Sequence, residues 1–464
     1  MRVLFASSEI FPYAKSGGLA DVADALPHAI KEFVEVSRVM PLYSFIQRDT
    51  LKKEMQYSIE LSGIEYRCVI YSKEEYGVVT YFIKAPLLSS TKNMYGDGDG
   101  GYANNDLRFA VFCKAIVELC KKLDIEIVHL NDWHTALVAL YIKDKKLNIK
   151  TLFTIHNLAY QGIFGFESLR RIGVSERYFT MDALEFYGGV NYLKAAIAYS
   201  DAITTVSPSY AKEILTQEFG AALDGFLKVH KNKLIGILNG INTDIFNPKT
   251  DKNIFCSFDK NSLENKYKNK VQFIKNSTLK DPRRPLFVMI SRLVEQKGVD
   301  MLLISLKQLL EKKINLFVLG DGDEQISSEF LKLSKLYDNF EFFRGYDEGL
   351  SHKVYASGDF LLMPSRFEPC GLNQMISMSY ATIPLVHSVG GLRDSVYEDN
   401  KGCGRGIVFE KFSKREFLNA VDRALKLKKD KERFDEVRVS NLGCDFSFTK
   451  SALKYLEIYK KLLA

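Results

Sequence analysis

Cysteine is scarce in this chain and gives no sign of a covalent or metal framework. The number of cysteines is odd, and no two of them form a C-x-x-C pair. They are Cys68, Cys113, Cys120, Cys256, Cys370, Cys403 and Cys444. Scattered thiols without metal-ligand spacing argue against a disulfide framework and against a structural zinc site. They favour a reduced, cytoplasmic setting.

Long apolar runs are also absent. No segment approaches the roughly 18 consecutive apolar residues that a membrane-spanning helix needs. The stretch Met1–Gly18 is partly apolar but carries Glu9, so we interpret it as a first core strand and not as a signal peptide. We therefore expect no membrane partner.

Charge of one sign does not accumulate either. The net charge is +7 over 464 residues, and the charged residues, 26% of the chain, form no long block of like charge. A nucleic-acid-binding tail is therefore not expected. The mild basic excess suits a small anionic substrate.

Several catalytic signatures are missing. The chain has no G-x-G-x-x-G after a strand, no Walker A motif, no H-E-x-x-H and no G-x-S-x-G. The chemistries that depend on these motifs are therefore not indicated. Asp97-Gly-Asp99 has the D-x-D pattern of some metal sites, but it does not follow a strand, and we predict no metal there.

The chain does have a regular alternation of short apolar strands and amphipathic helices, which is typical of parallel sheets covered on both faces. Strands are expected at Val3–Ala6, Val78–Ile83, Ile127–Leu130, Leu152–Ile155, Ala202–Val206, Leu286–Ile290, Leu316–Leu319, Glu341–Phe343, Phe360–Met363 and Ile383–Val386. Helices are expected over Asn105–Leu123 and near Asn261–Ile274. The glycine-rich segment Tyr95–Asn105 is expected to be a loop.

Length and composition indicate more than one domain, since a typical domain has roughly 150 residues. The segment 250–284 is rich in Lys, Asn and Asp, and a new apolar strand follows it. We expect an N-terminal domain over 1–244, a C-terminal domain over 245–448 and a last helix over 449–464. Both domains open with a strand, a loop that carries a lysine, and a helix that begins at glycine. This plan predicts an α/β protein of two Rossmann-like domains, with ligands at the C-terminal ends of the strands.

Two segments place glycine and charge between a strand and a helix. Lys15-Ser-Gly-Gly-Leu follows the first strand, and Ser365-Arg-Phe-Glu-Pro-Cys-Gly-Leu follows Phe360–Met363. Glycine allows close backbone approach, and the N–H groups of a first helical turn attract anions. Together, Lys15 and Glu368 predict an anionic sugar donor held by the two halves. Alternatively, Glu368 serves only the dipole of its helix.

Other polar residues lie at strand ends. Arg292 and Lys297 flank a strand-to-helix turn and could neutralise a diphosphate leaving group, although such a pair can also be a solvated loop. His156 directly follows Leu152–Ile155, a position that favours a functional role over a core one. Asp132 in Asn131-Asp-Trp-His could accept sugar hydroxyls, unless this segment, which holds the only tryptophan, serves packing.

These motifs together resemble glycosyltransferase family 5, the bacterial glycogen synthases and plant starch synthases. The resemblance runs in order through Lys15-Ser-Gly-Gly-Leu, Asn131-Asp-Trp-His, His156-Asn-Leu-Ala-Tyr-Gln-Gly, Leu238-Asn-Gly, Ser291-Arg-Leu, Gln296-Lys-Gly and Ser365-Arg-Phe-Glu-Pro-Cys-Gly-Leu. It implies a GT-B fold, in which a deep cleft separates two Rossmann-like domains. It also implies a cytoplasmic, retaining hexosyltransferase without metal or other cofactor. Such an enzyme moves glucose from ADP-glucose to the non-reducing end of an α-1,4-glucan such as glycogen.

The resemblance also implies roles for matching positions. Glu368 would be the essential carboxylate, Arg292 and Lys297 would hold the diphosphate, and His156 would face the glucose. The donor-binding residues would be Lys15, Gly18, Asn239, Tyr346, Cys370, Gly371 and Leu372. The residues on the sugar or acceptor side would be Asp132, Tyr102 and Asp21. The helix starting at Gly371 would contribute N–H groups, and the last helix, Lys450–Leu463, would cross back onto the N-terminal domain.

Other functions stay open at this point. UDP-glucose could replace ADP-glucose as the donor. A sugar-nucleotide epimerase would share the fold class, as would a phosphorylase, but a phosphorylase would be far longer and would need a lysine for pyridoxal phosphate, for which the sequence offers no site. A non-catalytic glucan-binding relative is the alternative outside enzymes, although glucan binding alone does not require Lys15, Arg292 and Lys297. Release of ADP in the presence of glycogen would separate an enzyme from a binding protein.

Overall fold

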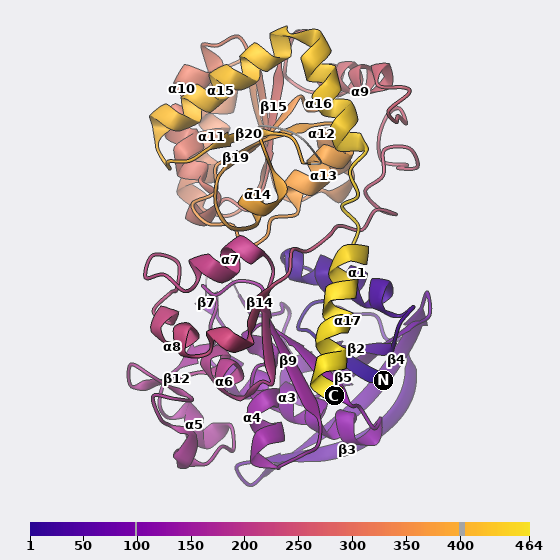
Figure 1. The fold of residues 1–464 in the computed structure, drawn as a ribbon, viewed down its shortest axis with the longest axis vertical. Helices are drawn as coiled ribbons and strands as arrows, with labels where there is room; N and C mark the ends of the chain where they lie inside the picture. The colour runs from indigo at the N-terminus through magenta and orange to yellow at the C-terminus, as the bar shows by residue number, and fades with distance from the viewer. Residues whose placement is uncertain (98–99, 399–403) are drawn as a thin grey trace. The chain divides into compact units, whose positions relative to one another are not determined.

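The computed structural model describes residues 1–97, 100–398 and 404–464, which divide into two compact units. Unit 1 comprises Met1–Asn239 and Phe448–Ala464, and unit 2 comprises Gly240–Ser447 (Figure 1). The chain therefore passes between the units twice. The first passage lies at Asn239, a few residues before the expected boundary.

Unit 1 is built on a nine-stranded sheet with the strand order β14-β13-β9-β8-β1-β2-β5-β4-β3. The strands of this sheet are β1 (Arg2–Ala6), β2 (Glu35–Pro41), β3 (Lys52–Leu61), β4 (Ile64–Glu75), β5 (Val78–Lys84), β8 (Ile127–Asn131), β9 (Lys150–Ile155), β13 (Ala202–Thr205) and β14 (Leu234–Gly236). From β14 to β5 all neighbours are parallel, whereas β4 pairs antiparallel with β5 and β3. Two small antiparallel sheets join β10 (Ile163–Phe164), β12 (Gly189–Asn191) and β11 (Glu185–Phe186), and β6 (Gly96–Asp97) with β7 (Gly100–Gly101).

The burial of each strand explains whether it could be predicted from the sequence. The central strands β1, β8 and β9 are almost entirely buried, so they form the short apolar runs that are typical of parallel strands. In contrast, β3 and β4 alternate buried and exposed residues and carry many charges, and neither was predicted. The prediction of a plain loop over Tyr95–Asn105 was wrong in one detail, because β6 and β7 pair within it.

Helices cover the sheet of unit 1 (Figure 1). They are α1 (Gly18–Ile30), α2 (Pro86–Ser89), α3 (Asn105–Lys122), α4 (Leu137–Asp144), α5 (Ser168–Arg171), α6 (Tyr192–Tyr199), α7 (Pro208–Glu213), α8 (Asp224–Val229) and α17 (Thr449–Leu463), with 3₁₀ turns η1 (Trp133–Thr135), η2 (Glu176–Tyr178) and η3 (Lys231–Lys233). The last helix, α17, lies beside α1 and buries Ala452, Tyr455 and Tyr459 in the same core as β1. The final segment of the chain is thus an integral layer of unit 1.

Unit 2 contains a six-stranded parallel sheet with the order β17-β16-β15-β18-β19-β20. Its strands are β15 (Leu286–Ile290), β16 (Asn315–Gly320), β17 (Phe340–Arg344), β18 (Phe360–Met363), β19 (Ile383–His387) and β20 (Ile407–Phe409). Its helices are α9 (Glu264–Lys275), α10 (Val299–Leu310), α11 (Glu324–Leu336), α12 (Glu348–Ser357), α13 (Asn373–Ser379), α14 (Gly390–Ser395), α15 (Lys414–Lys429) and α16 (Lys431–Leu442), with the 3₁₀ turn η4 (Glu295–Lys297). β15 and β18 are neighbours, with Phe287 opposite Phe360.

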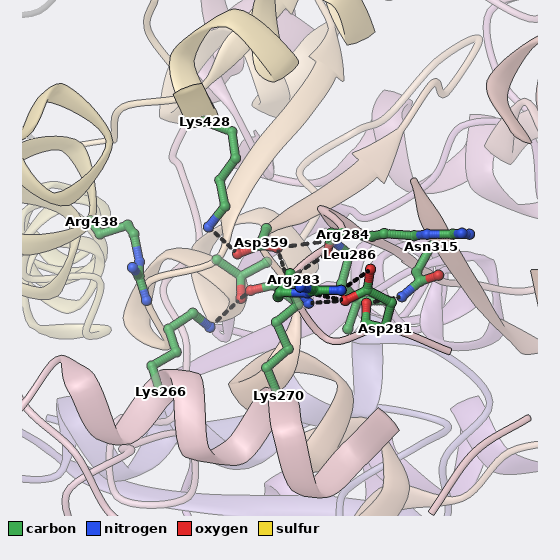
Figure 2. Close-up of polar contacts among 12 residues, drawn as sticks. Lys266, Lys270, Asp281, Arg283, Arg284, Leu286, Asn315, Asp359, Lys428 and Arg438 are labelled. Carbon is green, nitrogen blue, oxygen red and sulfur yellow. Dashed lines mark hydrogen bonds and ion pairs between the residues drawn. The ribbon is translucent and has the colours of Figure 1, made fainter. Parts of the chain in front are cut away.

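A buried carboxylate closes the N-terminal edge of this sheet (Figure 2). Asp359 accepts hydrogen bonds from Lys270 Nζ at 2.6 Å, from Lys428 Nζ at 2.8 Å and from the Leu286 backbone N–H at 2.8 Å. Burial alone would raise the pKa of Asp359, but the ammonium groups of Lys270 and Lys428 hold it well below its usual range. The cluster ties α9, α15, β15 and β18 together at the edge opposite the predicted site.

Within the described part of the chain, no helix combines the length and the apolar character that crossing a bilayer would require.

Candidate active site

In each unit, the polar residues that the sequence singled out lie where parallel strands end. In unit 2, Lys297 lies on η4, which follows β15, and Glu368 lies on the loop that follows β18. Because β15 and β18 are adjacent, these residues meet although they are 71 positions apart. Lys297 Nζ lies 2.9 Å from Glu368 Oε1 and 2.6 Å from Oε2. Glu368 is only 4% exposed and also accepts a 3.1 Å hydrogen bond from Ser365 Oγ.

The turn that carries Lys297 and the loop that carries Glu368 are packed into one surface. Gly298 has φ +68°, and a Cβ there would lie 1.8 Å from the carbonyl oxygen of Pro364, so only glycine fits. The Arg366 backbone N–H donates to the Gln296 carbonyl at 2.9 Å. The two backbone segments that carry Lys297 and Glu368 are therefore held together, and this positions the ion pair.

The segment after Glu368 differs from the expectation in one respect. The helix begins at Asn373 and not at Gly371, because Gly371 adopts φ +71° and Leu372 is the residue that precedes the helix. Asn373 Nδ2 donates to the Ile290 carbonyl at 2.6 Å, which ties this helix start to the end of β15. Cys370, within this segment, is buried.

Two further predicted residues lie at the same edge of the unit 2 sheet. Arg292 is exposed directly after β15. Tyr346 follows β17 and is 65% exposed. Both side chains are therefore accessible to a ligand at the strand ends.

In unit 1, the loop after β1 is organised by Glu9. This carboxylate is buried and accepts hydrogen bonds from the Ser16 backbone N–H at 2.5 Å, from Ser16 Oγ at 2.6 Å and from the Tyr95 hydroxyl at 2.6 Å. Lys15, next to Ser16, forms a 2.7 Å ion pair with Asp21 in the first turn of α1, the helix that Gly18 opens. Glu9 thus joins the Lys15 loop to the segment that contains Tyr95.

The ends of β1, β8 and β9 form a second polar group. Asn131 Nδ2 donates to the Ala6 carbonyl at 2.9 Å, so its Oδ1 faces His156 Nε2 at 2.8 Å. Because an amide oxygen only accepts, the proton of a neutral His156 lies on Nε2. Loss of hydration lowers the pKa of His156 to about 3, so the ring is neutral at pH 7.

Asp132 is less available than expected. It is 8% exposed, and its Oδ1 accepts the His156 backbone N–H at 2.8 Å. Burial raises the pKa of Asp132 to about 7, although the backbone N–H groups of His156 and Asn157 favour its ionised form. The structural role of Asp132 is therefore to stabilise the turn that contains His156, through this hydrogen bond.

The remaining predicted residues of unit 1 lie on loops. Asn239 follows β14 and is 5% exposed, and its Oδ1 has no hydrogen-bond partner among the described residues. A buried amide oxygen without a partner is costly, and a ligand hydroxyl would satisfy it. Tyr102 donates to Asp97 Oδ1 at 2.9 Å, and the Arg108 guanidinium lies 4.9 Å from the centre of its ring.

Comparison with known proteins defines the family. Residues 2–229 match the family model of the starch synthase catalytic domain, and residues 270–437 match that of glycosyl transferases group 1. The chain is 42% identical to the glycogen synthase of Aquifex aeolicus over 467 residues, which cover 100% of this chain and 99% of that protein. It is 38% identical to the glycogen synthase of Desulforamulus reducens over 480 residues, with the same coverage. The chain belongs to the glycogen and starch synthase family.

Structural comparison agrees with this assignment. The catalytic domain of Starch Synthase IV from Arabidopsis thaliana, solved bound to ADP and acarbose, matches with a TM-score of 0.91 and 33% identity, covering 99% of both chains. The chain thus has the GT-B fold and is a hexosyltransferase, and the family, fold class and enzyme class predicted from the sequence are confirmed.

Sequence reasoning did not find every residue that shapes the site. Glu9 served only to argue against a signal peptide, although a carboxylate just after a buried strand is itself a signal. Ser365 lies inside the Ser365–Leu372 motif, but nothing local in the sequence shows that it donates to Glu368. The Lys297–Glu368 pair has no local signal, because it depends on β15 and β18 being neighbours.

Of the two aspartates in the D-x-D pattern, only Asp97 lies among the described residues. Asp97 is bonded to Tyr102, whereas Asp99 lies outside the described residues, as does Cys403. Across residues 1–97, 100–398 and 404–464, no group of three or more His, Cys, Asp or Glu side chains is arranged to hold a metal ion.

Proposed function

We propose that this member of the glycogen synthase family transfers glucose from ADP-glucose to the non-reducing end of an α-1,4-glucan, with retention at the anomeric carbon. The observation that carries the proposal is the pair of Lys297 with the buried Glu368 at the strand ends of unit 2. The ADP and acarbose in the related Starch Synthase IV structure support an adenine nucleotide and a glucan-like acceptor. ADP-glucose and glycogen are thus the proposed partners.

In unit 2, we assign the diphosphate to Arg292 and Lys297. When the bond from glucose to the diphosphate breaks, negative charge develops on the leaving group, and these cations neutralise it. Lys297 can exchange one carboxylate oxygen for a phosphate oxygen without leaving Glu368. Glu368 then stabilises positive charge on the sugar, and its burial strengthens that interaction. Tyr346 is assigned to the adenine, and Cys370, Gly371 and Leu372 to the backbone beside the donor.

In unit 1, we assign the glucose to His156 and Asn239. With its proton directed to Asn131, His156 offers Nδ1 as an acceptor to a sugar hydroxyl, and Asn239 offers its Oδ1. Lys15 and Gly18 are assigned to the donor, and Tyr102, Asp132 and Asp21 to the sugar or acceptor side. The scattered thiols support a cytoplasmic setting for this reaction.

The test is release of nucleoside diphosphate by the purified full chain with glycogen as acceptor. ADP-glucose and UDP-glucose are each varied, and the anomeric configuration of the new linkage is read by NMR. We expect faster release of ADP than of UDP, together with new α-1,4 linkages. Preference for UDP-glucose would overturn the donor assignment, and binding of glycogen without release from either donor would favour a non-catalytic relative.

A further inference from the structure

A second polar layer crosses the unit 1 sheet directly behind the Asn131–His156 pair. His129 precedes Asn131 by two residues on β8, and Thr154 lies on β9 two residues before His156, which directly follows that strand. Side chains two positions apart on a strand lie on the same face of a sheet. The Asn131–His156 pair therefore lies one step further along the same two chain segments than the layer behind it.

This layer is a continuous chain of hydrogen bonds that begins on the last helix. The Tyr459 hydroxyl of α17 lies 2.7 Å from His129 Nδ1, and His129 Nε2 lies 2.7 Å from Thr154 Oγ1. Thr154 Oγ1 in turn lies 2.6 Å from Thr204 Oγ1 on β13. All four side chains are buried, and the rings of Phe5 and Tyr455 pack on His129 with centroids at 4.5 and 5.2 Å.

Burial keeps His129 neutral, since the loss of hydration lowers its pKa well below the usual value. A neutral imidazole has one donor and one acceptor nitrogen, and here both are used. The ring cannot turn without breaking one of these bonds inside the protein, where an unsatisfied polar atom is costly.

The backbones of the same two residues hold the site. The His129 carbonyl accepts Asn131 Nδ2 at 3.4 Å, and the Thr154 carbonyl accepts the Asp132 N–H at 3.0 Å. Asp132 in turn holds the His156 N–H, and Asn131 holds His156 Nε2. A shift of β8 against β9 at His129 and Thr154 would therefore move both supports of His156.

We propose that the layer Tyr459–His129–Thr154 positions His156, so that the hydrogen bond between the Tyr459 hydroxyl of the C-terminal helix α17 and His129 sets the rate of glucosyl transfer. Tyr459 and His129 act through His156 and are positioning residues. The statement about rate rests on the proposed function, whereas the statement about the position of His156 does not.

The test uses variants of the full chain that alter the layer without altering its shape. Tyr459→Phe keeps the ring and removes the hydroxyl. Thr154→Val removes the hydroxyl of Thr154, whereas Thr154→Ser keeps a hydroxyl at this position. Leu456→Ala is the matched control, because it removes apolar packing of α17 and leaves the polar layer intact. We measure the melting temperature of each variant. We then measure kcat and the KM for ADP-glucose of all variants at one common temperature well below melting.

We expect Tyr459→Phe and Thr154→Val to lower kcat by roughly 10- to 100-fold, the scale of a small misplacement of a reacting group, with a KM within about twofold of wild type. Thr154→Ser should retain most of the activity, and Leu456→Ala should lower the melting temperature without this loss of kcat. In a His156→Ala background, Tyr459→Phe should have no further effect on kcat. Losses of kcat that follow the melting temperature in all variants, or that multiply in the His156→Ala background, would overturn the proposal.

A second readout does not depend on activity. With ¹⁵N-labelled histidine, the ring signals of His156, assigned through His156→Ala, report its tautomer and surroundings. We expect these signals to shift in Tyr459→Phe and to stay in place in Leu456→Ala. Unchanged His156 signals in Tyr459→Phe would refute the positioning role, whatever the activity of the variant. Absence of glucosyl transfer by the wild type would instead refute the proposed function.

Discussion

At the scale of single residues, the charge arrangement around Glu368 decides how its removal should appear in kinetics. The carboxylate is buried and accepts hydrogen bonds from Lys297 through both oxygens, in a place where charge interactions are strong. Glu368→Gln keeps the shape and removes the charge. It also releases Lys297 for the diphosphate, so donor affinity should not fall.

We therefore predict that Glu368→Gln lowers kcat by roughly 100-fold or more with little change in the KM for ADP-glucose, because the lost interaction is made mainly in the transition state. Steady-state kinetics of the purified variant measures both constants. Ser365→Ala, which removes only the 3.1 Å hydrogen bond to Glu368, should lose much less activity. Near-normal turnover of Glu368→Gln would remove this residue from the mechanism.

For Lys15 we predict an effect on the KM for ADP-glucose, in contrast to the effect on kcat predicted for Glu368. Its ammonium is held 2.7 Å from Asp21, beside a helix start that Glu9 fixes in place. Because we assign Lys15 to the donor, Lys15→Gln should cost roughly 1–3 kcal/mol of binding, as for a hydrogen bond to a charged group. The KM for ADP-glucose should rise by more than that for glycogen when each substrate is varied in turn. Asp21→Asn keeps the ammonium and should be milder, and a change confined to the glycogen KM would place Lys15 on the acceptor side.

At the scale of secondary-structure elements, the site of unit 2 depends on how closely two turns approach. A Cβ on Gly298 would lie 1.8 Å from the Pro364 carbonyl oxygen, and its φ of +68° disfavours other residues. Gly298→Ala should therefore separate the turn of Lys297 from the loop of Glu368. We expect a loss of at least about 2 kcal/mol in unfolding free energy, measured by urea denaturation, and a large loss of ADP-glucose turnover.

Gly349→Ala is the matched control for this substitution in the same unit. Gly349 lies in the first turn of α12, where a Cβ would meet only ordinary contacts at 3.6 and 3.8 Å. Alanine favours a helix more than glycine does, so stability should stay or rise slightly. Equal effects of the two substitutions would show that the close approach at Gly298 is unimportant.

The same scale shows what the sequence could and could not predict. Leu286–Ile290 was predicted with the bounds that the structure has, because an apolar run between turn residues has few other interpretations. Lys52–Leu61 was missed, since it is a charged edge strand of which one face meets solvent. The strand-end positions of Arg292 and His156 could be read locally, but the contact of Lys297 with Glu368 requires the strand order of the sheet.

At the scale of the whole molecule, three histidines of unit 1 have a pKa below the usual value. In unit 1, burial lowers the pKa of His134 and His156 to about 3 and that of His129 well below its usual value. In unit 2, burial lowers the pKa of His387 in the same direction. Acid should therefore destabilise unit 1 through His129, His134 and His156.

The sign follows from proton binding. Between about pH 6.5 and pH 3, an unfolded histidine binds a proton that the folded His134 and His156 do not, so each contributes a loss of roughly 1.4 kcal/mol of unfolding free energy per pH unit of acidification. Asp132 opposes this between about pH 4 and pH 7, because its raised pKa lets the folded form keep a proton that the unfolded form has lost. With three histidines against one aspartate, the stability of unit 1 should fall as the pH drops from 6.5 toward 4.

The only tryptophan makes this measurable in the intact chain. Trp133 lies in unit 1, packed on Phe109 and His134 with ring centroids at 4.9 and 4.1 Å, so its fluorescence reports the unfolding of that unit. We predict that the midpoint of urea unfolding followed by tryptophan fluorescence falls steadily between pH 6.5 and pH 4.5. The change should be small between pH 8 and pH 7, where these histidines are neutral in both states. A fluorescence midpoint that does not change with pH below 6.5 would mean that His129, His134 and His156 take up protons within the folded unit.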